Sequence, residues 1–234
     1  MRLDKYLQKN GYGTKEIIHS FIKESKVKVN EEIVTDYHFQ LAKNDVVDVS
    51  KDIKKYKEFY YLILNKPIDY VSARSDKDNK TILSLIPSFY DKSSMNIVGR
   101  LDKDVTGLVL LTNDNKLYKR IIEPSREIKK IYLVSFAGNY RLIDKDYSQG
   151  LTYIDGTKTK PFKLEFLDCN NARITLCEGK YHEIKKIFKE LNLFVLSIHR
   201  IQISTIHLGD LEETKYRELS KEEVNTLKES LDLR

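Results

Sequence analysis

The stretch "MNIVGRLDKDVTGLVLLTND", from Met95 to Asp114, places charged residues directly before a core strand. Its second half, Gly107 to Thr112, is apolar enough to predict a buried strand. Arg100 and Asp102 stand two residues apart just ahead of that strand, behind Gly99. A surface turn accounts for this pair of charges, and so does an active site, because a rigid strand end holds a reactive side chain in place.

The composition is that of a globular chain with segregated charge. The 234 residues allow one large domain or two small ones. The chain has no run of eighteen apolar residues to span a membrane, and its start, "MRLDKYLQKN", lacks the apolar core of a signal peptide. Cys169 and Cys177 could pair, but two buried thiols in a reducing, cytoplasmic compartment are favoured. The net charge of +6 suits a polyanionic partner.

The basic charge is concentrated in a small N-terminal unit. Residues 1–30 carry seven Lys or Arg against three Asp or Glu, a net +4, whereas residues 31–50 carry one against five, a net −4. Helical spacing predicts a first helix in "RLDKYLQKN" and a second in "KEIIHSFIKE", capped by Thr14. "KVKVN" and "DVVDVS" predict short strands. We expect a domain over residues 1–50, a polar linker over 51–58 and a second domain over 59–234.

The second domain mixes strands and helices without regular alternation, which indicates the α+β class. "FYYLILNKP" at residues 59–67 predicts a central strand, and "FKLEFLD" and "ARITLCE" predict a hairpin around Asn170 and Asn171. Helices are predicted for "RLIDKDYSQG" at residues 141–150 and for "KYHEIKKIFKELN" at residues 180–192. "SKEEVNTLKESL" opens with a capping box, Ser220 and Glu223.

The chain lacks the common cofactor and metal motifs. It has no HExxH, CxxC, GxGxxG, P-loop or GxSxG sequence. We therefore expect no metal and no cofactor, and any catalysis would depend on ordinary charged and aromatic side chains.

Two further segments offer such side chains. In "KKIYLVSF", strand alternation points Lys130 and Tyr132 to one side. On the wheel of the helix after Gly179, Lys185 lies about 100° from the apolar position Ile184, at the rim of the buried face. Taken singly, each has a plain structural alternative, because a lysine at such a rim can simply extend to solvent and a tyrosine can belong to the core.

The N-terminal unit resembles the S4 RNA-binding domain. The resemblance lies in "RLDKYL", the helix start at Thr14 and Lys15, "VKVN" and "NDVVDV". It departs from the usual pattern in having Thr14-Lys15 in place of Ser-Arg, and Glu31 in place of Gly. The resemblance implies that basic side chains of the two helices bind RNA, among them Arg2, Lys5, Lys15 and Lys23.

The rest of the chain resembles the pseudouridine synthases in their RsuA-type ribosomal branch. "GRLDKDVTGLVLLTND" is similar to the central motif of that family, "YLILNKPIDYV" to its first motif and "KKIYLV" to its Lys-x-Tyr motif. "ITLCEGKYHEIKKIF" is similar to the third motif, with Glu183 in place of the usual Gln and Lys186 in place of the usual Arg. The resemblance implies a small S4 domain followed by a mixed, mainly antiparallel sheet.

It also implies a reaction without a cofactor, in which a uridine of RNA becomes pseudouridine. Asp102 would be the essential carboxylate, either attacking C1′ or removing a ribose proton, with Lys185 beside it as an ion-pair partner. Tyr132 would stack on the uracil, and Arg100 would hold the flipped nucleotide or fill its place. The further lysines expected at RNA phosphates are Lys66, Lys130, Lys180 and Lys186.

Three functional hypotheses follow from these resemblances. The first is a synthase, expected to be monomeric, that modifies one uridine of small-subunit (16S) rRNA, free or in an assembly intermediate. The second is the same reaction on 23S rRNA. The third is a non-catalytic RNA-binding or ribosome-assembly factor that keeps the fold.

Overall fold

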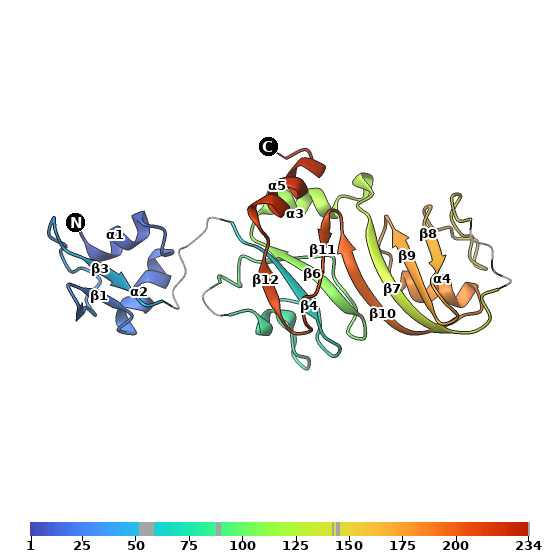
Figure 1. The fold of residues 1–234 in the computed structure, drawn as a ribbon, viewed down its shortest axis with the longest axis horizontal. Coiled ribbons are helices and arrows are strands. Elements are labelled where there is room, and N and C mark those ends of the chain that lie inside the picture. The colour runs from blue at the N-terminus through green and yellow to red at the C-terminus, as the bar shows by residue number, and fades with distance from the viewer. Residues whose placement is uncertain (52–58, 88–89, 142, 144–145, 234) are drawn as a thin grey trace. The chain divides into compact units, whose positions relative to one another are not determined.

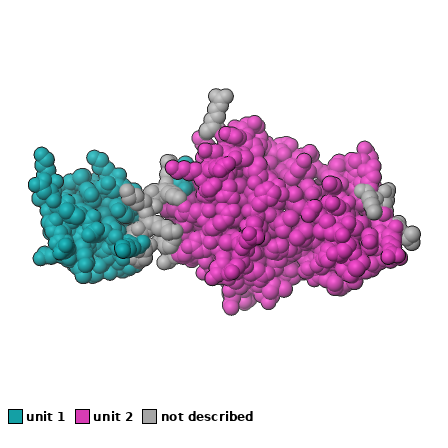
Figure 2. Space-filling view, viewed as in Figure 1, with its two compact units in different colours: residues 1–59 teal, residues 60–234 magenta. Residues whose placement is uncertain are grey.

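The computed structural model describes residues 1–51, 59–87, 90–141, 143 and 146–233. It divides into two compact units, Met1–Phe59 and Tyr60–Arg234 (Figures 1 and 2). The division falls at the end of the predicted linker, of which residues 52–58 lie outside the described part of the chain.

The first unit packs two helices on a small antiparallel sheet. Its elements are α1 (Leu3–Lys9), α2 (Lys15–Lys23), β1 (Val27–Val29), β2 (Glu32–Ile33) and β3 (Val47–Val49), with strand order β2-β1-β3. Thr14 caps α2, as predicted, since its hydroxyl accepts a hydrogen bond from the Ile17 amide. The apolar faces of both helices meet β1 in one core, formed by Leu3, Leu7, Ile18, Phe21, Ile22, Val27 and Val29.

The second unit is built on one large sheet (Figure 1). Nine strands of the described residues belong to it, seven of them in the order β12-β4-β6-β10-β7-β9-β8, while β5 pairs with β6 and β11 with β10. The strands are β4 (Tyr61–Lys66), β5 (Asn96–Val98), β6 (Thr106–Thr112), β7 (Lys130–Ala137), β8 (Lys163–Phe166), β9 (Asn171–Leu176), β10 (Phe194–Ile203), β11 (Ile206–His207) and β12 (Tyr216–Glu218).

The predicted mixed, mainly antiparallel sheet is confirmed. Strands β6 and β10 run parallel, with Thr106 opposite His199 and Gly107 opposite Arg200. The other named strand pairs are antiparallel, including the predicted hairpin of β8 and β9. Strand β4 lies between β12 and β6 and is buried over most of its length, which agrees with its continuous apolar run.

Three α-helices and two short 3₁₀ helices of the described residues complete this unit. They are α3 (Asn115–Ile122), α4 (Glu183–Glu190), α5 (Lys221–Ser230), η1 (Ile82–Leu85) and η2 (Pro124–Arg126). Helices α3 and α5 lie next to each other (Figure 1) and bury Leu117, Ile121 and Leu227 in a core shared with the sheet. The predicted capping box of Ser220 and Glu223 starts α5.

Some sequence expectations differ from the structure. The helix predicted for residues 141–150 is absent at positions 141, 143 and 146–150; there the Asp146 carboxylate accepts a hydrogen bond from the Ser148 amide, a local bond that competes with a helix. Cys169 and Cys177 are free thiols, but the expectation that both are buried is wrong, since Cys169 is exposed and Cys177 is half-buried. Within the described part of the chain, no helix combines the length and apolarity needed to cross a membrane.

Candidate active site

A cavity of about 740 Å³ opens in the second unit beside the start of β6. Its walls come from the loop between β5 and β6, from β7 and from the segment that leads into α4. Asp102, Tyr132 and Lys185 all line it. The structure therefore brings the three predicted catalytic residues, which are up to 83 positions apart in the sequence, to one concave site.

The buried side chain of Lys66 anchors the loop that carries Asp102. The Lys66 Nζ donates hydrogen bonds to the carbonyl oxygens of Pro67 at 3.0 Å, Lys103 at 3.2 Å and Val105 at 2.7 Å. Ser72 adds a second attachment, since its hydroxyl both donates to the Leu101 carbonyl and accepts from the Leu101 amide, each at 3.0 Å.

The prediction that Lys66 contacts an RNA phosphate is wrong. Its side chain is fully buried, and its three acceptors are backbone carbonyls. Burial lowers the pKa of Lys66 to about 8, although the charges of Asp104 and Asp102 act in the opposite direction. A lysine that follows an apolar strand can turn inward where loop carbonyls need a donor, so Lys66 positions the loop instead of meeting solvent.

The predicted ion pair of Lys185 with Asp102 is also wrong in this structure. The Lys185 Nζ lies 2.5 Å from Asp104 Oδ2, and this contact holds the pKa of Asp104 below its usual value. Asp102 instead faces His182, whose Nε2 lies 3.4 Å from Asp102 Oδ2. Asp102 and Asp104 are two residues apart in one loop, and Lys185 meets Asp104, the more exposed of the two at 59% against 40%.

Asp102 remains open to the cavity. Its side chain is 40% exposed, and that of His182 is 35% exposed. His182 is held at the start of α4 with φ of +53°, and its ring stacks on Tyr181 with centroids 3.8 Å apart. The cavity therefore presents an accessible carboxylate next to an imidazole and an aromatic ring.

Tyr132 is fixed by a buried arginine. The Arg200 guanidinium donates from Nε to the Leu108 carbonyl at 2.7 Å, from Nη2 to the Gly99 carbonyl and from Nη1 to the Tyr132 hydroxyl at 3.5 Å. Arg200 is 1% exposed and Tyr132 is 7% exposed. One side chain of β10 thus ties together β6, β7 and the residue that opens the catalytic loop.

This arrangement depends on the absence of a side chain at Gly107. Strand β6 passes Arg200 so closely that a Cβ on Gly107 would lie 2.3 Å from the Arg200 carbonyl oxygen and 2.5 Å from its nitrogen. The φ of Gly107 is +106°, a conformation that disfavours other residues. The glycine of the sequence motif is therefore explained by backbone contact at the β6–β10 pair.

A buried carboxyl group, Glu183, forms part of the cavity wall. Its Oε2 accepts a hydrogen bond from the Lys180 amide at 2.9 Å, and the Glu178 side chain contacts the same carboxyl group. Burial, together with Glu178, raises the pKa of Glu183 to about 7. Glu183 is thus able to hold a proton near neutral pH, and a protonated carboxyl group can donate a hydrogen bond as an amide does.

The other predicted RNA-binding cations of this unit are distributed unevenly. Arg100 and Lys180 are exposed and line the cavity. Lys130 and Lys186 do not line it: burial lowers the pKa of Lys130, which donates to the Ile128 carbonyl at 3.2 Å, and Lys186 lies on the exposed side of α4, 6.0 Å from the Tyr181 ring.

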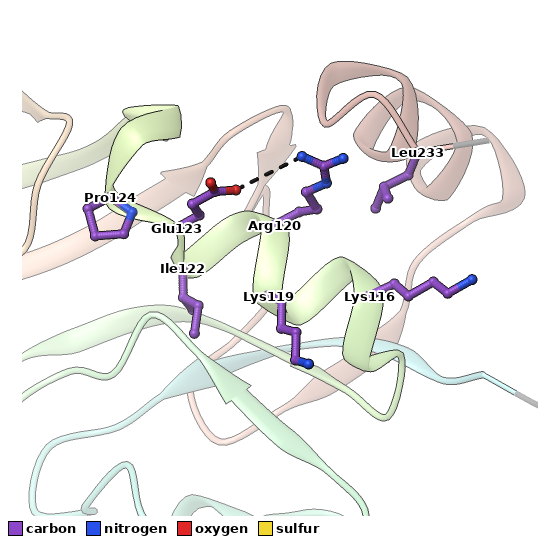
Figure 3. A pocket seen from close by; sticks show the side chains of 7 residues that line it. All are labelled: Lys116, Lys119, Arg120, Ile122, Glu123, Pro124 and Leu233. Carbon is purple, nitrogen blue, oxygen red and sulfur yellow. Dashed lines mark ion pairs between the residues drawn. The ribbon is translucent and has the colours of Figure 1, made fainter.

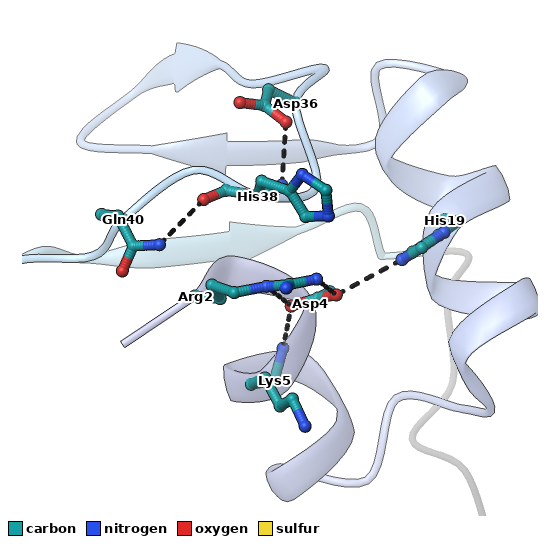
Figure 4. Close-up of polar contacts among 7 residues, drawn as sticks. All are labelled: Arg2, Asp4, Lys5, His19, Asp36, His38 and Gln40. Carbon is teal, nitrogen blue, oxygen red and sulfur yellow. Dashed lines mark hydrogen bonds and ion pairs between the residues drawn. The ribbon is translucent and has the colours of Figure 1, made fainter.

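The predicted cations of the first unit lie on α1 and α2 or directly before α1. Lys5, Lys15 and Lys23 are exposed. Arg2 is partly used inside the unit, because its guanidinium donates to both Asp4 carboxylate oxygens at 3.0 and 2.6 Å, and His19 reaches the same carboxylate from α2 (Figure 4). This contact with Arg2 lowers the pKa of Asp4 to about 2.

Comparison with known proteins identifies the family. A model described as RNA pseudouridylate synthase matches residues 60–190, and a model of the S4 domain matches residues 1–47. The ribosomal small subunit pseudouridine synthase A of Haemophilus influenzae is 36% identical over 97% of this chain and 99% of its own length. The chain belongs to the pseudouridine synthase family.

Relatives of this pseudouridine synthase extend along its whole length. The uncharacterized RNA pseudouridine synthase YtzG of Bacillus subtilis is 33% identical over 98% of the chain and 99% of the relative. A crystal structure of a pseudouridylate synthase is 35% identical, with a TM-score of 0.65 over 97% of this chain and 99% of that one. The predicted fold, an S4 domain followed by a synthase domain, is thereby confirmed.

Sequence reasoning missed the parts played by Asp104, His182 and Arg200 in this synthase. Asp104 and His182 stood inside motifs but beside the positions that were assigned roles. For Arg200 a signal was present, since a cation in the middle of the apolar strand "SIHRIQIS" needs buried acceptors. Within the described residues, His, Cys, Asp and Glu side chains form no cluster of three or more suited to a metal ion.

Proposed function

We propose that this synthase converts one uridine of small-subunit (16S) rRNA to pseudouridine, with Asp102 as its essential carboxylate. The observation that carries the proposal is the cavity in which the exposed Asp102 carboxylate and Tyr132 meet. The substrate follows from relatives, because the full-length relatives from H. influenzae and Escherichia coli, 36% and 33% identical, are named as small-subunit synthases. We further expect a cytoplasmic monomer.

The reaction is an isomerisation that needs no net oxidant or co-substrate. The N1–C1′ bond of the uridine breaks, the uracil turns, and a C5–C1′ bond forms while the C5 proton leaves and N1 gains one. Asp102 acts at the ribose, at C1′ or at a ribose proton. The cavity must first admit a nucleotide taken out of its stack, which costs a few kcal/mol.

The surrounding residues would position that nucleotide. Tyr132, fixed by Arg200, offers its ring to the uracil, and a contact of this kind is worth about 1–3 kcal/mol per base. Arg100 at the exposed rim would hold the flipped nucleotide's backbone or fill the space it leaves. Lys185 acts through its ion pair with Asp104, which joins α4 to the loop of Asp102.

The first unit would anchor structured RNA through α1 and α2. We propose the division of labour predicted from the sequence, with RNA binding in residues 1–50 and catalysis in residues 59–234. The exposed Lys5, Lys15 and Lys23 are its RNA contacts, and Arg2 contributes through the part of its guanidinium that Asp4 leaves open.

The test is to map pseudouridines in rRNA from cells with and without this protein. A single 16S uridine that loses its modification supports the proposal, whereas a 23S uridine or no change contradicts it. In the purified system, Asp102→Asn should abolish pseudouridine formation and keep rRNA binding. Asp104→Asn, two residues away in the same loop, is the comparison variant; it breaks the contact with Lys185 and should lower the activity without abolishing it.

A further inference from the structure

The active-site cavity is the first of three adjoining hollows in the second unit. A second cavity, of about 550 Å³, shares Arg100, Tyr132, Gly179 and Lys180 with it. A third, open groove of about 660 Å³ along α3 shares Ile122, Glu123 and Pro124 with the second. Because neighbouring hollows share wall residues, the three lie next to one another between Asp102 and the outer surface of α3.

The second cavity combines an apolar floor with basic side chains. Tyr118, Ile121 and Ile128 contribute to the floor. Its basic side chains include Lys130, Lys160 and Lys180, of which Lys160 is paired with Glu127 at 3.0 Å and Lys180 with Glu178 at 3.1 Å. RNA-binding proteins hold unstacked bases on apolar and aromatic side chains and contact the phosphates with cations. The mixture of walls is therefore suited to a nucleotide.

The third groove continues the positive charge along α3. Figure 3 shows the side chains of Lys116, Lys119 and Arg120 extending from this helix, with Leu233 opposite. Lys116 and Lys119 are exposed, and no carboxylate of the described residues is placed within ion-pair distance of either. Two such lysines, one helical turn apart, can contact successive phosphates of a strand.

The acidic residues of the second cavity and the α3 groove are already engaged. Glu123 is paired with Arg120 at 4.0 Å and with Arg126 at 3.5 Å. Glu178 is paired with Lys180 at 3.1 Å and accepts a hydrogen bond from the Lys160 amide at 2.6 Å. These ion pairs cancel charge of both signs. Among the described residues, Arg100, Lys116 and Lys119 are placed in no ion pair and leave the lining net positive, which favours an anionic occupant over an acidic or purely apolar peptide.

We propose that the second cavity and the α3 groove bind the single-stranded RNA on one side of the target uridine. The strand leaves the active site between Arg100 and Lys180, places its neighbouring base over the floor of the second cavity and carries its phosphates past Lys119 and Lys116. This inference rests on the proposed function, because it takes the first cavity as the site of the flipped uridine.

The test measures binding of RNA to the full-length protein carrying Asp102→Asn, which prevents turnover. The probes are a single-stranded RNA with the mapped uridine at its centre and two shortened RNAs, each lacking one flank. The test variant adds Lys116→Glu and Lys119→Glu. The matched control adds Lys163→Glu and Lys189→Glu, two exposed lysines outside all three hollows, and so has the same net charge.

We expect the α3 variant to bind the full probe roughly tenfold more weakly, with the slope of log Kd against log salt reduced by about 1.4 for two lost single-strand contacts. The control should bind as the parent does. Removing one particular flank should abolish the difference between the variants, and removing the other should preserve it. The neutral pair Lys116→Gln and Lys119→Gln should show the same reduction in slope. It keeps the test valid if charge reversal disturbs the fold.

Equal binding by the α3 variant and the control, or an α3 effect that survives removal of either flank, would overturn the inference. These outcomes are independent of the test of the proposed function. If rRNA mapping shows no uridine whose modification depends on this protein, the proposed function fails, and the RNA probes for the second test cannot be designed. If mapping succeeds and the α3 variant binds like the control, only the path along α3 is wrong.

Discussion

The Nζ of Lys185 lies 2.5 Å from Oδ2 of Asp104 and thereby joins helix α4 to the loop that carries Asp102. The loop is attached at three places: Lys66 binds the Val105 carbonyl, Ser72 binds Leu101, and Lys185 binds Asp104. Asp102 itself is left accessible between these attachments. A loop fixed on several sides can present one carboxylate to a substrate with little loss of entropy on binding.

The ion pair predicts coupled effects of its two partners. Asp104→Asn and Lys185→Gln should each lower kcat/KM by roughly ten- to a hundredfold, because a displacement of the loop misaligns Asp102. The double variant should be little worse than either single one, since each single change already breaks the contact. Kinetics of pseudouridine formation measure this. Strictly additive losses would show that the pair does not act as a unit.

Lys66 is expected to matter for stability as well as for activity. Lys66→Met keeps the length of the side chain but leaves three loop carbonyls without their donor, which should lower the free energy of unfolding by about 2–3 kcal/mol. Lys103→Met, at an exposed position of the same loop, is the control and should change it by less than about 0.5 kcal/mol. Denaturant unfolding of both variants gives the comparison. Similar stability of the two would contradict the role assigned to Lys66.

Local sequence patterns predicted most of the elements but not the contacts that build the site. Strands β4 and β6, the β8–β9 hairpin and the caps at Thr14 and Ser220 follow from signals within a few residues. The acceptors of Arg200 lie 92 and 101 positions away, and those of Lys66 up to 39 positions away. No periodicity reports such partners, because they exist only once the sheet is assembled.

The candidate site shows the same limit. The sequence motifs indicated which segments meet, and Asp102, Tyr132 and Lys185 do line one cavity. The motifs did not indicate whether Lys185 would pair with Asp102 or with Asp104. Which of two carboxylates in one loop it meets depends on side-chain geometry, which a sequence motif does not contain. The motifs also left Glu183 as a plain departure from a motif, whereas its burial beside Glu178 gives it a distinct protonation state.

Gly107 offers a sharp test of the close contact between β6 and β10. In Gly107→Ala the new Cβ would meet backbone atoms of Arg200, which cannot move aside as a flexible side chain can. We expect the free energy of unfolding to fall by about 3 kcal/mol or more. Gly179→Ala is the control, since a Cβ there meets nothing within 4 Å. Thermal unfolding of both proteins checks this, and equal melting temperatures would rule out the contact.

The first unit should set the affinity for rRNA without affecting chemistry. Lys15→Glu with Lys23→Glu reverses two exposed charges of α2 and should weaken rRNA binding by roughly tenfold or more, with a smaller dependence on salt. The reversal of Lys163 and Lys189 serves again as a control of equal net charge. Filter binding at several salt concentrations gives both quantities. Unchanged affinity would mean that α2 is not an RNA contact.

Glu183 predicts how stability depends on pH. The pKa of Glu183 is raised to about 7 in the folded chain by burial and by Glu178, from an ordinary value near 4.5. Between these values the folded chain keeps a proton that the unfolded chain has lost, so stability falls as pH rises through this window. The ionisable groups that act on this carboxyl group are Glu178 and Lys180, and its charge in turn acts on Tyr153 and Lys130. Of these, Glu178 opposes ionisation most directly.

Glu183→Gln should remove this fall, because the amide is nearly the same size and stays neutral. The variant should match the parent below about pH 4.5 and become progressively more stable than it up to about pH 7, beyond which the difference stays constant. Glu190→Gln, on the last turn of the same helix, is the control and should follow the parent. Unfolding free energies measured across this range give the comparison, and a constant offset between variant and parent at every pH would mean that folding does not raise the pKa of Glu183.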